Sequence, residues 1–493
     1  MTKPRRSAGA AIGWKGAQLG GGQLIAFLRL IVLARLLTPA DFGLVAVAAA
    51  TIGVLMGVSN LGVRQALIQQ APDDNLSYDV AWTLGMVRAA GVTLLVMLLA
   101  PTAASLFGEP QAAPIVRGMA LRPVIDAAAS IGVLKLTRQL AFRRLAFMAL
   151  PASLVDAIVA IALAPRLGVW AMVAGTLSGA VVQVGLSYVA APHRPRFRFE
   201  RRASAELVQY GRWILATGIM ALAGRALMQF GVSRLLGAAA LGQYVVASRL
   251  AFLPTEVASA VIGAVAFPLY ASYRGDHVRA ARAFSMFLTG QVLVLLPLSA
   301  IIMALAPIFE GALGGGWTGT AGITQLLTTA CVVGLFGDGV VPLLLGQGRA
   351  GRAFLVEAVQ TSANLALLFP LLTIFGVPGA ALALLGGTLV AQFVSAHFSR
   401  QVVRMSLNEL AMRRCGAAAI AAVLAAGVAM ALRGFLTGLP GLAMAGAAAV
   451  STAVGTLWVL DARHGLRLHE FLPWDASWHS LDPADPEPER IDA

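Results

Sequence analysis

Long apolar segments separated by short polar loops repeat along almost the whole chain. Each holds roughly 20 residues or more, enough for a helix to cross a hydrocarbon core about 30 Å thick. Their apolar positions do not alternate with polar ones, which argues against the strands of a transmembrane barrel. The pattern therefore predicts an all-α polytopic membrane protein with about fourteen transmembrane helices. Their expected ranges are 14–36, 42–63, 80–104, 113–134, 145–164, 168–190, 207–234, 241–268, 283–307, 319–345, 353–375, 377–398, 413–433 and 439–460.

The longest internal polar stretch follows the sixth apolar segment and is rich in Pro and Arg. It predicts a basic cytoplasmic linker, at 193–206, between an N-lobe (1–192) and a C-lobe (207–398) of six helices each. Two extra helices at 399–460 and a cytoplasmic tail at 461–493 complete the expected organisation.

One short motif occurs twice, at equivalent places in the two expected lobes. Ala-Arg-Leu-Leu at 34–37, followed by Gly43, returns as Ser-Arg-Leu-Leu at 233–236, followed by Gly242. Each copy joins the first two helices of its lobe. Duplicated bundles are a common build of transporters, with the binding site where the repeats meet. We expect Arg35 to lie at the rim of a cavity on the outer side, and its counterpart in the second copy likewise.

Apolar residues make up 58% of the 493 residues and charged ones only 12%, which excludes a soluble globular protein. The net charge of +14 does not indicate nucleic-acid binding, because the arginines collect in alternate short loops. That distribution is typical of cytoplasmic loops and predicts that both termini are cytoplasmic. Cys331 and Cys415 are the only cysteines, so we expect no disulfide framework and no metal site. Nothing in the sequence indicates a cofactor.

Several expected helices carry arginines within their apolar runs. An ionisable side chain there costs at least ~2.5–3.5 kcal/mol on insertion scales, so it needs a partner or a water-filled cavity. Guanidinium groups suit phosphate oxygens, and the sequence predicts a cationic cavity for an anionic substrate. The candidate substrate-binding residues are Arg29, Arg88, Arg122, Arg225 and Arg249.

Acidic residues within the spans are the candidates for coupling transport to an ion. They are Asp126, Asp156, Glu256 and Asp338. In the alternative interpretation these charges are structural: Arg122 pairs with Asp126, Arg249 pairs with Glu256, and residues near span ends extend to the interface.

Two smaller patterns concern packing. Gly175 and Gly179, four residues apart, indicate a close approach between helices. Tryptophans near span ends are expected to be interfacial anchors. They are Trp82, Trp170, Trp317 and Trp458.

Eight segments carry a family resemblance in the right order along residues 10–400. They are LRLIVLARLLTPADFGLVAVAAA (28–50), SNLGVRQALIQQ (59–70), DVAWTLGMVRAAG (79–91), LTRQLAFRRLAF (136–147), LGVWAMVAGTLSG (167–179), AFPLYASYRGDHVRAARAF (266–284), LGGGWTGT (313–320) and LLLGQGRAGRAF (343–354). Together they resemble the polysaccharide-transport (oligosaccharide flippase) family of the multidrug/oligosaccharidyl-lipid/polysaccharide exporter superfamily. Arg88 is the cavity arginine that falls inside a matched segment.

The resemblance implies two six-helix lobes in a V around a central cavity. It also implies a flippase, not an enzyme, that moves an undecaprenyl-diphosphate-linked oligosaccharide across the bacterial inner membrane by alternating access. Exopolysaccharide, capsule or O-antigen would be the product, and a polysaccharide polymerase and a chain-length regulator would be partners besides the membrane lipids.

Other functions remain as alternatives. A multidrug/cation antiporter of the same fold would favour carboxylates in its cavity. A membrane polysaccharide polymerase would need a general base or metal-binding acids near the surface, and the expected outer loops carry only Asp41, Glu109 and Glu310. A non-transporting membrane scaffold fits poorly with charges inside the spans.

Overall fold

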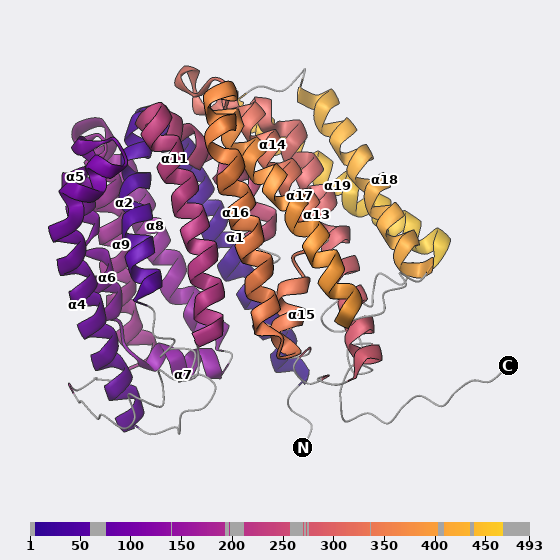
Figure 1. The fold of residues 1–493 in the computed structure, drawn as a ribbon, viewed down its shortest axis with the longest axis horizontal. Helices are drawn as coiled ribbons and strands as arrows, with labels where there is room; N and C mark the ends of the chain where they lie inside the picture. Colours follow the sequence, from indigo (N-terminus) through magenta and orange to yellow (C-terminus); the bar gives the residue numbers. More distant parts are fainter. Residues whose placement is uncertain are drawn as a thin grey trace. The chain divides into compact units, whose positions relative to one another are not determined.

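The structure is a computed structural model of the 493-residue chain (Figure 1). It describes residues 5–59, 75–139, 141–192, 197, 212–256, 270, 273, 276–335, 337–402, 409–433 and 438–466. The expected linker and tail lie almost wholly outside these residues.

Throughout this described part the chain forms helices joined by turns, without a strand. The helices before residue 200 are α1 (Arg5–Leu36), α2 (Pro39–Val58), α4 (Asn75–Leu106), η1 (Pro110–Ala112), α5 (Ala113–Met119), α6 (Arg122–Ala127), α7 (Gly132–Arg138), α8 (Phe142–Leu167) and α9 (Trp170–Ala190). The later ones are α11 (Arg212–Ala251), α13 (His277–Leu313), η2 (Gly315–Trp317), α14 (Thr320–Gly334), α15 (Val340–Gly346), α16 (Ala350–Phe375), α17 (Val377–Val402), α18 (Glu409–Arg433) and α19 (Gly438–His464).

Eleven of the described helices are long and apolar enough to cross a membrane. The predicted all-α, multi-pass membrane architecture is therefore confirmed. The count differs from fourteen because three regions depart from one unbroken helix per span.

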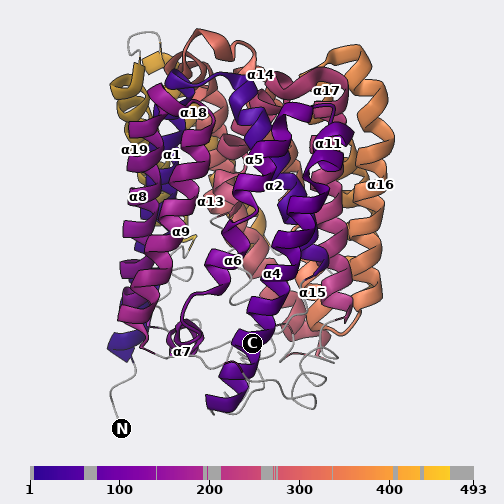
Figure 2. The same cartoon turned by 90° about the vertical axis from the view of Figure 1, so that its left-hand side faces the viewer.

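The fourth expected span, at 113–134, is divided into α5, α6 and α7, which follow one another as separate short helices in Figure 2. Pro114 lies in the first turn of α5 and Pro123 in the first turn of α6. Proline cannot donate a helical hydrogen bond and its ring clashes with the preceding turn, so a continuous helix is broken there. The tenth expected span is likewise divided, into α14 and α15, around the glycines at 334, 337 and 339.

The seventh expected span and the start of the eighth are the two arms of α11, and residues 257–268 of the eighth lie outside the described residues. Gly237 separates them with φ +84° and ψ 176°, which is not helical. A residue without a Cβ adopts this backbone at little cost, so the chain reverses where the duplicated motif predicts a hairpin.

The chain divides into two compact units. The first unit comprises Met1–Leu250, Glu310–Leu327 and Glu357–Gly387, and the second comprises Ala251–Phe309, Thr328–Val356 and Thr388–Ala493. The predicted lobe boundaries remain a prediction.

Within the first unit, α8 packs between α9 and α1, while α2, α4, α5 and α6 pack against one another (Figure 2). In the second unit, α18 and α19 pack through alanines against α13. Small side chains let these backbones approach closely, which supplies van der Waals contact where the bilayer gives no hydrophobic driving force. The alanines at this contact are Ala304, Ala425, Ala429, Ala445 and Ala449.

Candidate functional site

The first unit contains an ion pair between two helices that the sequence places far apart. Arg29 of α1 and Asp156 of α8 lie 3.1 Å apart, from Nη2 to Oδ1. Their side chains are only 20% and 25% exposed. A charge in such a position requires an opposite charge or strong hydrogen bonds, and the pair meets that requirement in part.

Two glycines of α9 make room for this acid. A Cβ at Gly175 would lie 2.8 Å from Oδ1 of Asp156, and a Cβ at Gly179 would lie 2.8 Å from the Cβ of Asp156. Any larger residue would displace the carboxylate or the helix. The predicted close helix approach at these glycines is confirmed, and its consequence is a fixed position for Asp156.

More positive charge surrounds the pair. The guanidinium of Arg29 experiences repulsion from Arg249 and Arg122, and the carboxylate of Asp156 experiences attraction from Arg122 as well as Arg29. Three of the five predicted cavity arginines thus interact electrostatically at Arg29, and two of them, Arg29 and Arg122, also interact with the carboxylate of Asp156. We call these four residues the arginine group.

Arg122 also pairs with Asp126 on its own helix, at 3.4 Å, as the structural interpretation predicted. Both side chains are about half exposed. An exposed pair at this spacing contributes roughly 0.3–0.5 kcal/mol, so it does not bind Arg122 firmly.

The remaining two cavity arginines lie elsewhere in the first unit. Arg88 of α4 donates from Nη1 to the carbonyl oxygen of Met56 near the end of α2, at 3.4 Å. Arg225 of α11 is exposed and lies within electrostatic reach of Glu357 on α16. The sequence alone did not indicate Glu357 as the partner of Arg225.

Two predicted ion-coupling residues, Glu256 and Asp338, lie in the second unit and are exposed. Asp338 follows α14, in the turn before α15. In the described part of the chain, no group of three or more His, Cys, Asp or Glu side chains could hold a metal ion. An ion-coupling role for these acids stays a prediction.

The two copies of the duplicated motif contact each other within the first unit. Gly43 lies directly against the carbonyl group of Ala238, and Gly242 lies directly against that of Pro39. The same offset of 199 residues relates Gly43 to Gly242 and Pro39 to Ala238. Each hairpin therefore places its glycine against the same backbone carbonyl of the other. We call 34–43 and 233–242 the interlocked hairpins.

Local hydrogen bonds fix the first of these hairpins. Thr38 accepts from the backbone N–H of Asp41, and Asp41 accepts from the backbone N–H of Thr38 at 2.9 Å. This reciprocal cap, with Pro39 in the first helical turn, satisfies free N–H groups and sets where α2 begins.

A loop from the opposite half of the chain closes over each hairpin. Arg35 donates from Nε to the carbonyl oxygen of Ala312 at 2.7 Å, and Trp317 donates from Nε1 to that of Ala34 at 2.9 Å. On the second hairpin, Ser233 donates from Oγ to Phe107 at 2.9 Å, and the N–H of Ala238 donates to Glu109 Oε1 at 2.6 Å.

Trp317 corrects an expectation. It was expected to anchor at the membrane interface, but only 1% of it is exposed. Its ring stands edge-to-face on Phe42, with centroids 5.2 Å apart. A buried indole needs an acceptor for its N–H, and the carbonyl of Ala34 is that acceptor. Trp170 and Trp458 remain 42% and 72% exposed, as anchors should be.

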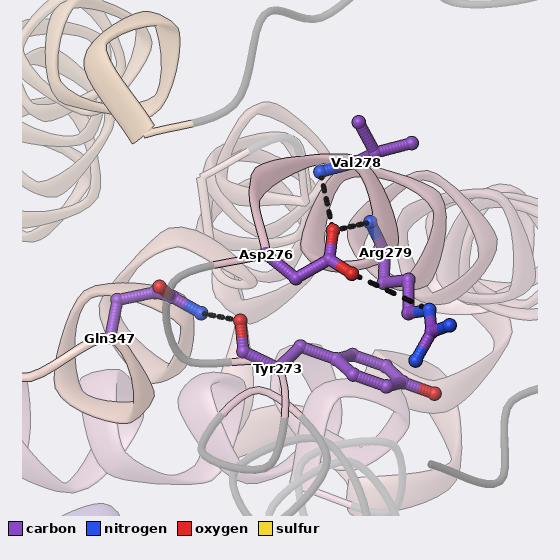
Figure 3. Close-up of polar contacts among 5 residues, drawn as sticks. All are labelled: Tyr273, Asp276, Val278, Arg279 and Gln347. Carbon is purple, nitrogen blue, oxygen red and sulfur yellow. Dashed lines mark hydrogen bonds and ion pairs between the residues drawn. The ribbon is translucent and has the colours of Figure 1, made fainter.

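In the second unit, two of the segments that carry the family resemblance meet (Figure 3). Gln347, which follows α15, donates from Nε2 to the carbonyl oxygens of Tyr270 and Tyr273 at 3.0 and 3.2 Å. Asp276 accepts from the N–H groups of Val278 and Arg279 at 3.1 and 2.9 Å, which caps the start of α13. Burial raises the pKa of the Tyr270 phenol, which therefore stays neutral. This cluster holds backbone in place and carries no excess of charge for a ligand.

Solved structures share this fold. A lipid II flippase, MurJ, in an inward closed conformation aligns with a TM-score of 0.68 at 12% identity, over 92% of this chain and 99% of that one. An inward-facing multidrug resistance MATE family transporter of the MOP superfamily aligns with a TM-score of 0.59 at 16% identity, over 77% and 94%. The fold is thus the multi-helix fold that these two solved transporters share.

A family model described as "Polysaccharide biosynthesis protein" matches residues 32–321, more than half of the chain, and the chain belongs to this family. The succinoglycan biosynthesis transport protein ExoT of Rhizobium meliloti is 26% identical over 72% of this chain and 73% of its own. The lipopolysaccharide biosynthesis protein WzxC of Escherichia coli is 23% identical over 76% of each. The family resemblance read from the sequence is confirmed.

Proposed function

We propose that the protein is a flippase that moves an undecaprenyl-diphosphate-linked oligosaccharide from the inner to the outer leaflet of the bacterial inner membrane. The names of its relatives, which concern succinoglycan transport and lipopolysaccharide biosynthesis, support a role in exopolysaccharide, capsule or O-antigen assembly. The observation that carries the proposal is the arginine group, in which two further guanidinium groups act electrostatically on the Arg29–Asp156 pair inside a transporter fold.

A diphosphate is a suitable ligand for this group. It offers several charged oxygens, and arginine binds such oxygens through two parallel N–H donors. Hydrogen bonds to charged groups contribute about 1.5–3 kcal/mol each. The arginine group, together with Arg88 and Arg225, would hold the headgroup while the polyprenyl chain remains in lipid.

The interlocked hairpins supply the closed side that alternating access requires. If the basic loops and both termini are cytoplasmic, as the sequence predicts, both hairpins lie on the outer side of the membrane. The hairpins must separate for a headgroup to leave toward the outside. Their backbone-to-backbone contact makes this a discrete step between two states.

A multidrug/cation antiporter shares the fold but fits the site less well. A cationic drug would meet three arginines and one acid that is already paired. The transporter fold of the chain also supports transport rather than polysaccharide polymerisation. A polysaccharide polymerase and a chain-length regulator are the proposed partners of the protein in the same pathway.

The proposed function is tested in a strain that lacks the gene. We expect undecaprenyl-linked repeat units to accumulate on the cytoplasmic leaflet and polymer export to stop, and the wild-type gene to restore export. Arg88→Ala and Arg225→Ala should abolish export at unchanged protein level, whereas Arg117→Ala, on an exposed arginine outside the arginine group, should export normally. A deletion strain with normal export and no stranded repeat units would refute the proposal.

A further inference from the structure

We propose that Asp156 is the resident counter-ion of Arg29: it holds the guanidinium while no substrate is bound, and the substrate's phosphate oxygens then displace it. This inference rests on the proposed function and adds a role for the acid, which opposes binding and promotes release.

The two members of the pair differ in their freedom to move. Asp156 has a short side chain, and Gly175 and Gly179 bring α9 against its Cβ and Oδ1. Arg29 reaches it on a long side chain with several rotatable bonds. When the pair opens, the arginine is the group that moves.

The pair leaves Arg29 incompletely satisfied. The contact with Asp156 is through Nη2, and Nε of Arg29 is buried without a hydrogen-bond partner among the described residues. A guanidinium has five N–H donors in a planar fork. A phosphate that accepts from two of them would satisfy more donors than Asp156 does, so displacement is favourable although an ion pair is broken.

The surrounding charges set the direction of this exchange. Arg122 of α6 and Arg249 of α11 both repel Arg29, whereas Asp156 attracts Arg29 and Arg122. With a diphosphate bound, Asp156 becomes an uncompensated negative charge close to the phosphates and weakens their hold. A carrier needs such a repulsive interaction, because a site that binds its substrate too tightly does not release it.

The same geometry argues against a bound cation at Asp156. The guanidinium of Arg29, 3.1 Å from Oδ1, occupies the position that a coupling ion would take, and two further arginines repel one. The built-in cation is Arg29 itself.

The test measures binding of undecaprenyl diphosphate, without sugar, to the purified full chain in nanodiscs. We expect Asp156→Asn to lower the Kd about tenfold, because Arg29 is then free to make one charge-assisted hydrogen bond to the phosphate. Arg29→Gln should raise the Kd about tenfold, because that bond is lost. The double variant should bind more weakly than Asp156→Asn, because the guanidinium that the acid holds in the resting state is then absent. Asp276→Asn is the matched control: it removes the acid of the half-exposed pair with Arg279 in the second unit and should leave the Kd within about twofold.

Unchanged or weaker binding by Asp156→Asn would overturn the proposal and leave Asp156 as a residue that positions Arg29. Asp156→Ala, which also removes the acid without enlarging the residue beside Gly175, must give the same direction if the charge is the cause. Polymer export from the complemented deletion strain distinguishes a failure of the counter-ion role from a failure of the proposed function. If the wild type restores export but Asp156→Asn binds no more tightly, the counter-ion role fails alone. If the wild type neither restores export nor binds the lipid, the proposed function fails.

Discussion

The contact between the interlocked hairpins predicts what a single methyl group will do there. A Cβ at position 43 would lie 2.9 Å from the Cα of Ala238 and closer still to its carbonyl oxygen. A Cβ at position 242 would lie 2.8 Å from the carbonyl carbon of Pro39. The atoms in the way are backbone, so no rotamer change relieves the overlap. The carbonyl carbon of Ala238 lies 2.5 Å from the Cβ at position 43. Carbon atoms pack at about 3.5–4.0 Å, so the hairpins must separate by at least about 1 Å for Gly43→Ala and about 0.7 Å for Gly242→Ala.

The free-energy cost of Gly43→Ala or Gly242→Ala follows from this overlap. Overpacking a tight contact costs about 1–3 kcal/mol, which corresponds to a roughly 5- to 150-fold loss of the interlocked state relative to one with parted hairpins. The two substitutions act on one contact, so their effects should not add.

Labelling of a cysteine measures the parted state. In a chain with Cys331→Ser and Cys415→Ser, the reporter Ala26→Cys lies about one helical turn before Arg29 on α1. We expect a membrane-impermeant maleimide, added outside intact cells, to label the reporter faster in both glycine variants than in the parent. Gly53→Ala is the matched control on α2, because no described atom outside the helix lies within 4 Å of its Cβ. Equal labelling rates in Gly43→Ala, Gly242→Ala and Gly53→Ala, at equal protein level, would refute the idea that the interlocked hairpins close the outer side.

Three further substitutions test the parts around this contact and the ion pair. Thr38→Val removes the cap of α2 and should lower the free energy of unfolding by about 1 kcal/mol, seen as a lower melting temperature in detergent; no change would mean that the cap adds nothing to Pro39. Trp317→Phe keeps an aromatic ring on Phe42 but loses the donor to Ala34, so its destabilisation should be about 0.5–1.5 kcal/mol, against about 3–5 kcal/mol for Trp317→Ala. Equal losses would show that the hydrogen bond, and not the ring, stabilises the loop. Gly175→Ala should reduce polymer export as Arg29→Gln does, because its Cβ would lie 2.8 Å from Oδ1 of Asp156. Gly185→Ala, whose Cβ meets no described atom within 4 Å, is its control on the same helix, and equal export from both would contradict the role given to Gly175.

The helices could be predicted from sequence because each span is an apolar run of sufficient length, a local property. Breaks in those helices were also signalled locally. Pro114 and Pro123 mark where the fourth span divides, and reading them as helix breakers would have found α5 and α6. The close packing of α9 was readable for the same reason, since Gly175 and Gly179 share one helix face.

The partners of the arginines could not be predicted in this way. Periodicity places Arg29 on one face of α1, but it does not say that the neighbouring helix is α8 or that Asp156 lies at the same depth. For the same reason, the sequence does not show that Arg225 of α11 and Glu357 of α16 lie within electrostatic reach of each other. Trp317 was misread because a tryptophan beside a span is usually interfacial, and only the fold shows the hairpin that covers it.

The duplication extends to the scaffold but not to the chemistry. At the offset of 199 residues the contacting pairs are interchanged, Gly43 with Gly242 and Pro39 with Ala238, whereas Arg29 corresponds to the buried, uncharged Met228. A reciprocal contact needs a glycine in both copies, because either methyl group alone meets the other hairpin's backbone. A diphosphate, in contrast, needs one cationic site, and a second copy would add repulsion between arginines without a second ligand to offset it. The asymmetry of the charges is therefore what the proposed carrier of one anionic headgroup requires, and the symmetry of the hairpins is what lets them close against each other.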